Sequence, residues 1–302
     1  MNSKSDYQPP VSQLLTIGRP QNIGPNQWFD YVDAYGFTED HVPDLIRMAS
    51  DKNWNWEDEG ECYASIHAYR TLGQLKAESA IAPLLSLLDQ EESDWYLEDL
   101  PRVFSMIGPT CIPTLTDYLV DSEHSVFGKM TAASGLTNIA KSYPAHREEC
   151  IQLLTDALAC HKQQPSELNG SLVAKLLDLE ATDAADVIEK AYKEGPMDEM
   201  VCGSWARVQI ELGLATAADF TPEELQYKVP EWMEPIQKMA DLVTEAAQAQ
   251  AALGMSAQAS AKDLELPQFG KGSLESGKSK SSKPKSGFGS QRPKEKKKKK
   301  QR

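Results

Sequence analysis

The sequence lacks the features of membrane, secreted and metal-binding proteins. No apolar run approaches the roughly 18 to 20 residues that a membrane-spanning helix needs, and residues 1–10 contain no apolar stretch typical of a secretory signal. The five cysteines form no CxxC pair, which argues against a disulfide scaffold and a thiolate metal site. We therefore expect a cytoplasmic protein with no metal site, no cofactor and no membrane span.

Motifs of catalysis are absent as well. The sequence contains no GxSxG, Walker, GxGxxG or HExxH motif. His67 follows Cys62 by five positions and His161 directly follows Cys160, and neither spacing brings two side chains to one helical face. His67 is therefore interpreted as a packed helix residue. The sequence predicts no catalytic residue and a non-enzymatic protein.

Charge is distributed in two regions of opposite sign. The net charge of the 302 residues is −14. Residues 262–302 contain 14 basic and 4 acidic residues, a net of +10, whereas residues 1–261 contain 17 basic and 41 acidic residues, a net of −24. This asymmetry is typical of a folded acidic body with a basic interaction tail.

Apolar residues before the tail recur at the spacing of helices, and almost no segment alternates with period two, so the fold class is predicted to be all-α. Four units of two short amphipathic helices are predicted at residues 63–90, 94–119, 127–158 and 168–192, followed by a last helix over Met200 to Leu212. The turns of the first two units, at Gly73 and Gly108, are 35 residues apart. Such units cannot bury both apolar faces alone, so they are expected to stack into an α-solenoid.

Two stretches resemble HEAT repeats, namely LGQL followed by AIAPLLSLL and MIGP followed by CIPTLTDYL. They are most similar to the short bacterial type also found in phycobilisome-lyase-like proteins. The block from Trp28 to Leu214 resembles bacterial HEAT-repeat proteins that end in a lysine-rich tail. Pro101 and the connector at residues 142–144 depart from the pattern. The resemblance implies an armadillo-like helical solenoid that binds proteins, or, as an alternative, a bilin chaperone or lyase.

The sequence predicts four regions. Residues 1–26 are expected to form an irregular arm because prolines and glycines interrupt them, residues 27–215 the HEAT-like solenoid, and residues 216–261 a linker and a capping or heptad-patterned helix. Residues 262–302 are expected to be disordered, because they hold too few apolar residues to fold alone.

The predicted helix over 231–253 has apolar residues at alternating steps of four and three. These residues are Trp232, Ile236, Met239, Val243, Ala246 and Leu253, with polar Gln250 at the remaining position. One interpretation is a helix that covers the end of the solenoid. The other is self-association or binding of a partner helix through residues 232–253.

Aromatic residues stand beside acidic runs at two places. Trp54 and Trp56 lie among acidic residues of a predicted connector, and Trp95 and Tyr96 lie in the acidic run from Asp89 to Asp99. Aromatic side chains can anchor a partner while carboxylates steer a basic one, so these four residues are the protein-binding candidates. In the alternative interpretation the two connector indoles fold under the loop.

The basic tail ends in a lysine run. Its candidate binding residues are Lys294, Lys296, Lys297, Lys298, Lys299, Lys300 and Arg302. They are suited to contacting nucleic acid or the ribosome without sequence specificity, the acidic body, or more weakly anionic lipid.

Together these features predict a non-enzymatic protein-binding scaffold. The solenoid surface would engage an unknown protein, one with a basic segment if the aromatic and acidic residues form the site. The tail would add electrostatic contact. A protein that binds nucleic acid or the ribosome mainly through this tail is the alternative.

Overall fold

The computed structural model describes residues 7–20, 22–24, 27–51, 61–89 and 94–228, and short stretches at 233, 235–236, 238–240 and 242–244. The chain divides into two units, Met1–Ala240 and Asp241–Arg302. The helices and strands named below belong to the first unit.

The fold is all-α, as the periodicity predicts. The α-helices are α1 (Tyr31–Tyr35), α2 (Val42–Ala49), α3 (Ala64–Gln74), α4 (Ile81–Leu87), α5 (Asp94–Ile107), α6 (Ile112–Val120), α7 (Val126–Ser142), α8 (Arg147–Ala159), α9 (Ser166–Asp178), α10 (Ala185–Glu194), α11 (Glu199–Cys202) and α12 (Trp205–Glu211). The 3-10 helices are η2 (Val11–Thr16), η3 (Glu39–His41), η4 (Glu61–Tyr63), η5 (Glu78–Ala80), η6 (Pro109–Cys111), η7 (Pro144–His146), η8 (His161–Gln163), η9 (Thr182–Ala184) and η10 (Ala217–Asp219). Two short strands, β1 (Asn22–Gly24) and β2 (Gln27–Trp28), pair antiparallel.

Capping residues and proline set the helix boundaries near the N-terminus. The side chain of Asp30 accepts a hydrogen bond from the backbone N–H of Asp33 at 2.9 Å and so caps α1. Gly36 ends α1 with φ +69°, a conformation that favours glycine. Pro43 lies in the first turn of α2, and Thr38 caps η3. These caps place α1 and α2 against α3.

The N-terminal segment is more regular than the sequence suggests. Between its prolines and glycines the chain forms η2, and Val11, Leu14 and Leu15 are buried there together with Tyr7. Trp28 lies in β2, because α1 starts only after the Asp30 cap. The segment therefore contributes to the core.

The helix predicted over Met200 to Leu212 is divided in two. Gly203 adopts φ +82°, which ends α11, and the Ser204 side chain accepts a hydrogen bond from the N–H of Arg207 and caps α12. The hydroxyl of Tyr192 on α10 donates to the carbonyl of Gly203 at 2.7 Å. This contact from another helix holds the break, which the apolar spacing alone does not reveal.

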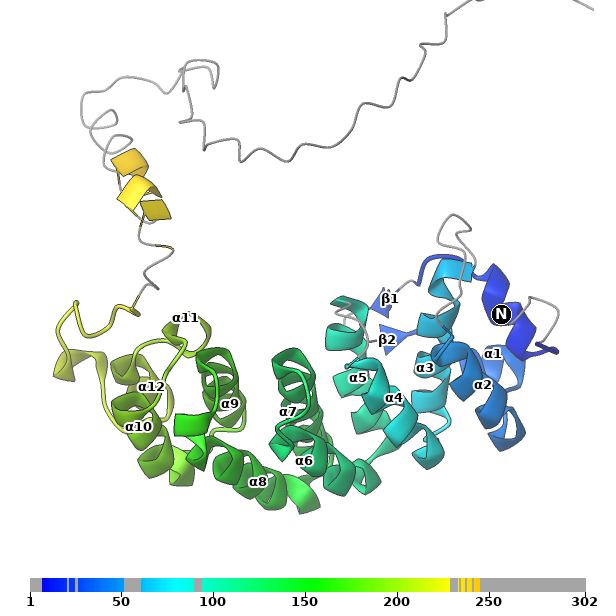
Figure 1. Ribbon diagram of the computed structural model, residues 1–302, viewed down its shortest axis with the longest axis horizontal. Helices are drawn as coiled ribbons and strands as arrows, with labels where there is room; N and C mark the ends of the chain where they lie inside the picture. Colours follow the sequence, from blue (N-terminus) through cyan, green and yellow to red (C-terminus); the bar gives the residue numbers. More distant parts are fainter. Residues whose placement is uncertain are drawn as a thin grey trace, which may run out of the picture. The chain divides into compact units, whose positions relative to one another are not determined.

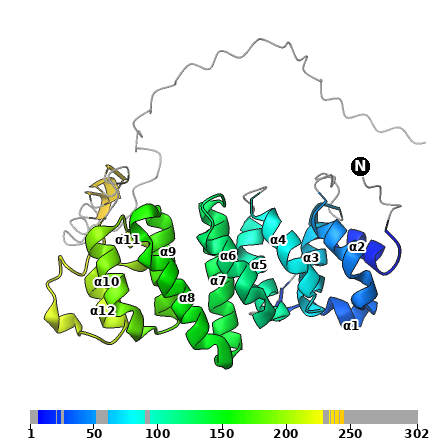
Figure 2. The same ribbon diagram turned by 60° about the horizontal axis from the view of Figure 1, so that its bottom comes forward.

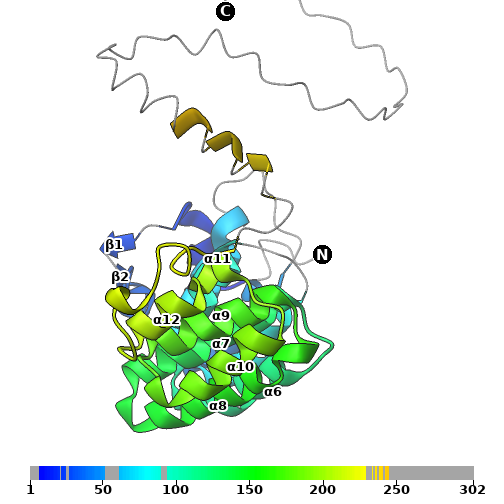
Figure 3. The ribbon, with the colours of Figure 1, turned by 90° about the vertical axis from the view of Figure 1, so that its left-hand side faces the viewer.

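The helices form two rows. In one, α3, α5, α7, α9 and α11 each contact the next, and in the other α2, α4, α6, α8, α10 and α12 do so. Figure 1 shows α7 and α9 above α6 and α8, and Figure 3 shows the same two layers seen along the rows. Figure 2 shows α6 to α9 side by side. Across the rows, α2, α4, α6 and α8 contact α3, α5, α7 and α9 in turn, so these helices pack against both rows.

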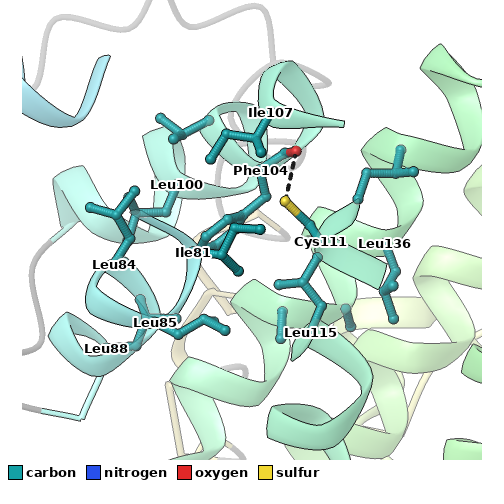
Figure 4. Packing of buried hydrophobic residues seen from close by; sticks show 14 of the residues in the cluster. Ile81, Leu84, Leu85, Leu88, Leu100, Phe104, Ile107, Cys111, Leu115 and Leu136 are labelled. Carbon is teal, nitrogen blue, oxygen red and sulfur yellow. Dashed lines mark hydrogen bonds between the residues drawn. The ribbon is translucent and has the colours of Figure 1, made fainter. Parts of the chain in front are cut away.

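The core runs between the rows. Figure 4 shows Leu84 and Leu85 of α4, Leu100 and Phe104 of α5 and Leu115 of α6 converging there. The buried Cys111 thiol donates a hydrogen bond to the Phe104 carbonyl, and burial raises the pKa of this thiol to about 12. Cys111 therefore behaves as a small packing residue.

Several predictions concern residues outside the described part of the chain. The lysine-rich tail and residues 1–6 of the predicted N-terminal arm lie there, as does most of the helix predicted over residues 231–253. Within its described residues, Ile236, Met239 and Val243 are exposed. No helix of the described residues is both long and apolar enough to span a bilayer.

Candidate functional site: a groove along helices α3 and α5

Gln74, at the end of α3, fixes the segment that forms one wall of the site. Its side-chain carbonyl accepts a hydrogen bond from the backbone N–H of Tyr31 at 2.8 Å, and its amide donates to the carbonyl of Phe29 at 2.7 Å. These partners lie more than 40 positions earlier in the chain. One glutamine therefore holds β2 and α1 against α3.

A buried ion pair joins α3 to α5. Arg70 donates two hydrogen bonds to the carboxylate of Asp99, at 2.7 and 3.1 Å, and the hydroxyl of Tyr69 donates to the same carboxylate at 3.1 Å. Both charged side chains are almost fully buried. The fork of the guanidinium sets the two helices in one register.

Two guanidinium groups lie over the indole of Trp28. The Arg70 group is 4.5 Å from the ring centroid and the Arg102 group of α5 is 4.1 Å from it. Stacking on an aromatic face suits the planar and weakly hydrated guanidinium. Trp28 is therefore buried and links β2 to both helices.

Two adjoining cavities open beside this cluster and form what we call the α3–α5 groove. The larger, about 640 Å³, is lined by Gln27, Trp28, Asp30, Val32, Asp33, Gly36, Gln74, Arg102 and Met106. The smaller, about 430 Å³, is lined by Gly73, Gln74, Lys76, Arg102, Ser105, Met106, Ser142 and Tyr143. Because both include Gln74, Arg102 and Met106, they form one groove along the ends of α3, α5 and α7.

The groove presents both charge signs and several hydroxyl groups. Asp30 and Asp33 stand exposed in the larger cavity, and Arg102 stands where the two cavities meet. In the smaller cavity the hydroxyls of Ser105 and Ser142 lie 2.9 Å apart and tie α5 to α7. Such a lining can hydrogen-bond a peptide backbone and pair with a charged side chain.

A buried histidine connects the N-terminal segment to α3 behind the groove. His67 Nε2 lies 2.7 Å from the Gly18 carbonyl, and Nδ1 lies 2.7 Å from the Tyr31 hydroxyl. Since a carbonyl only accepts, Nε2 carries the proton and Nδ1 accepts from Tyr31. Burial lowers the pKa of His67 to about 4 and raises that of Tyr31 to about 12. This histidine is a neutral structural residue, in agreement with its interpretation from the sequence.

The predicted aromatic anchors are only partly placed by the structure. Trp54 and Trp56 lie outside the described residues. Trp95 and Tyr96, on the first turns of α5, are half-buried, and their rings meet Tyr63 and Tyr69 edge-on at centroid distances of 6.3 and 6.0 Å. Their role as anchors stays a prediction.

The acidic run from Asp89 to Asp99 does not present all its carboxylates to a partner. Asp99 is paired with Arg70 inside the core. Asp89 accepts a hydrogen bond from the Tyr118 hydroxyl at 2.7 Å and lies 2.9 Å from His124 Nδ1. These two carboxylates therefore serve packing of the chain itself.

Sequence reasoning missed the residues that build the groove. Trp28, Gln74 and Arg102 carry no local motif, and they meet only through tertiary contacts. One signal was available for the pair beneath them: Arg70 follows Tyr69 in a predicted amphipathic helix, and a guanidinium that is buried there requires an anion.

The described residues contain no group of three or more His, Cys, Asp or Glu side chains arranged to hold a metal ion. Ser125 lies beside His124 and Asp89. Its hydroxyl oxygen accepts a hydrogen bond from the N–H of Gly128 and so caps α7, and the hydroxyl donates to the Leu88 carbonyl. Its contacts are those of a helix cap.

The chain matches no model of a known protein family, and neither a curated protein nor a solved structure is significantly similar to it. The groove must therefore be interpreted from its own geometry.

Proposed function

We propose that this protein is a non-enzymatic, cytoplasmic scaffold that binds a partner protein in the α3–α5 groove. The observation that carries the proposal is the pair of adjoining cavities of about 640 and 430 Å³ along one row of helices. Their combined lining of apolar, hydroxyl and charged groups suits an extended protein segment more than a small apolar ligand.

The architecture supports an α-solenoid of HEAT-like repeats. Helices of each row contact their own neighbours, as stacked two-helix units do. In such a solenoid the helices of one row line a continuous surface, and the groove lies on the odd-numbered row. A partner would contact several units at once.

Charge favours a partner with a basic segment. Asp30 and Asp33 face the larger cavity, and residues 1–261 carry a net charge of −24. An acidic body attracts a basic partner at long range, and carboxylates in the groove pair with it at contact. The lysine-rich tail would add an electrostatic tether to an anionic part of the same assembly.

Affinity capture from native lysate tests the proposal. The full chain is compared with Asp33→Lys in the groove and with the matched control Asp117→Lys, an exposed site on α6 in the other row. Both substitutions change the net charge equally. We expect a partner that is captured at least tenfold less by Asp33→Lys and unchanged by the control, because like charges in contact oppose binding by more than about 1.4 kcal/mol.

Capture that is equal for both variants would contradict the groove. Capture that disappears on nuclease treatment and in a chain ending at Ala261 would instead place binding on the tail and nucleic acid. Circular dichroism of each variant checks that the fold is kept.

A further inference from the structure

A separate cavity lies at the other end of the helical rows. Its volume is about 370 Å³, and its walls come from α10, α11, α12 and the segment of residues 216–228. This segment is held over α12 by a hydrogen bond from the Ser204 hydroxyl to the Glu224 carbonyl at 2.7 Å and by one from Arg207 Nε to the Leu225 carbonyl at 2.5 Å. The cavity is thus a built feature of the fold.

Aromatic rings form part of the walls. Tyr192 and Trp205 lie with their ring centroids 5.6 Å apart, and Phe220 faces the cavity from the covering segment. The Tyr192 ring is fixed because its hydroxyl donates to the Gly203 carbonyl. Aromatic faces can hold the alkyl stem of a lysine or arginine and attract its charge.

Carboxylates line the same cavity. Glu199 is almost buried, and its carboxylate accepts a hydrogen bond from the backbone N–H of Lys228 at 2.8 Å. Glu224 accepts one from the N–H of Thr221, and Glu223 stands exposed at the rim. Carboxylates and aromatic rings therefore line the same cavity.

Two lysines line the cavity, and neither is held closely by its carboxylates. The Lys228 ammonium lies 3.7 Å from Glu199, beyond hydrogen-bond distance, on a side chain that is 89% exposed. The other cavity lysine, Lys193, is paired with Glu189 on α10 at 2.8 Å. Lys228 is thus a weakly held cation at the mouth of the cavity, and another cation can displace it.

We propose that this cavity binds a lysine or arginine side chain from a basic protein segment. The alkyl stem lies against Trp205 and Phe220, and the charged head reaches Glu199 and Glu223 in place of Lys228. The site is distinct from the α3–α5 groove, so either can fail without the other.

Fluorescence anisotropy with the full chain tests this site. The probe is a labelled peptide of four lysines spaced by Gly-Ser pairs, and its reference is the same peptide with norleucine for lysine. Glu223→Gln is compared with Glu211→Gln, an exposed site on α12 outside the cavity lining. We expect Glu223→Gln to weaken peptide binding about fivefold and Glu211→Gln to weaken it less than twofold. Both variants lose one negative charge, but only Glu223→Gln loses a carboxylate that contacts the bound lysine.

A gain of affinity provides the second measurement. Lys228→Ala removes the competing ammonium, so binding should strengthen about threefold, and more than in Lys190→Ala, an exposed lysine on α10 outside the cavity. Equal effects of Glu223→Gln and Glu211→Gln, or of the two lysine variants, would overturn the proposal, as would equal binding of the norleucine peptide.

Discussion

His67 makes the stability of this protein depend on pH above the range in which carboxylates titrate. The imidazole is fully buried, and its two nitrogens are occupied by the Gly18 carbonyl and the Tyr31 hydroxyl. Burial lowers its pKa to about 4 in the folded protein, against about 6.5 in the unfolded chain. As pH falls below about 6.5, the unfolded chain binds a proton that the folded protein does not, so acid favours unfolding.

The magnitude follows from these two pKa values. Protonation of His67 in the unfolded chain lowers the free energy of unfolding only slightly at pH 7 and by about 2 kcal/mol at pH 5. The loss levels off near 3 kcal/mol below the folded pKa of about 4. Urea unfolding of the wild type and of His67→Gln between pH 7 and pH 5 measures it. The variant is expected to be less stable at pH 7 because it loses buried hydrogen bonds, and the difference should shrink by about 2 kcal/mol at pH 5.

An unchanged difference across this pH range would refute the argument, because it would mean that His67 is not kept neutral by burial. His146→Gln is the control, since this histidine is exposed before α8 and meets Glu149 at the surface. The difference in unfolding free energy between the wild type and His146→Gln gives the effect of removing a histidine outside the core.

Two further substitutions test the packing between helices. Asp99→Ala leaves the buried Arg70 guanidinium without its anion, so it should lower the free energy of unfolding by about 3 to 5 kcal/mol, whereas the double variant Arg70→Met/Asp99→Leu should recover most of the loss in urea unfolding. A loss below 1 kcal/mol in Asp99→Ala would contradict the buried pairing. Gly170→Ala in α9 would bring a methyl group to 2.7 Å from the Asp198 carbonyl, so we expect a net loss of about 1 to 3 kcal/mol despite the better helix propensity of alanine. A higher thermal midpoint for Gly170→Ala than for the wild type would contradict this prediction, because it would mean that α11 moves to make room for the methyl group.

Local periodicity was sufficient to predict most helices. The predicted apolar faces of α4 and α6 are buried as expected, because each helix packs mainly through residues spaced by three and four positions. The all-α class follows from the same pattern. A boundary failed where a distant group decides it, as at Gly203, whose carbonyl accepts a hydrogen bond from Tyr192.

Local sequence patterns could not predict the α3–α5 groove. Helices α1 to α4 lie between Trp28 and Arg102 in the sequence, so no local window contains both. Asp99 was grouped with exposed acids because its neighbours are acidic, yet the helix turns it inward to Arg70. Charge in a sequence shows how many carboxylates exist, and only packing shows which of them face solvent.

Segments of the chain itself cover the two ends of the helical rows. At the start of the chain, the buried residues of η2 lie against α3, where a preceding unit would stack if the rows were extended. At the other end, the segment around Leu225 is hydrogen-bonded across α12. A second copy would have to displace one of these segments before its helices could continue a row. The contacts that complete the fold therefore cover the faces on which a further helix pair would stack.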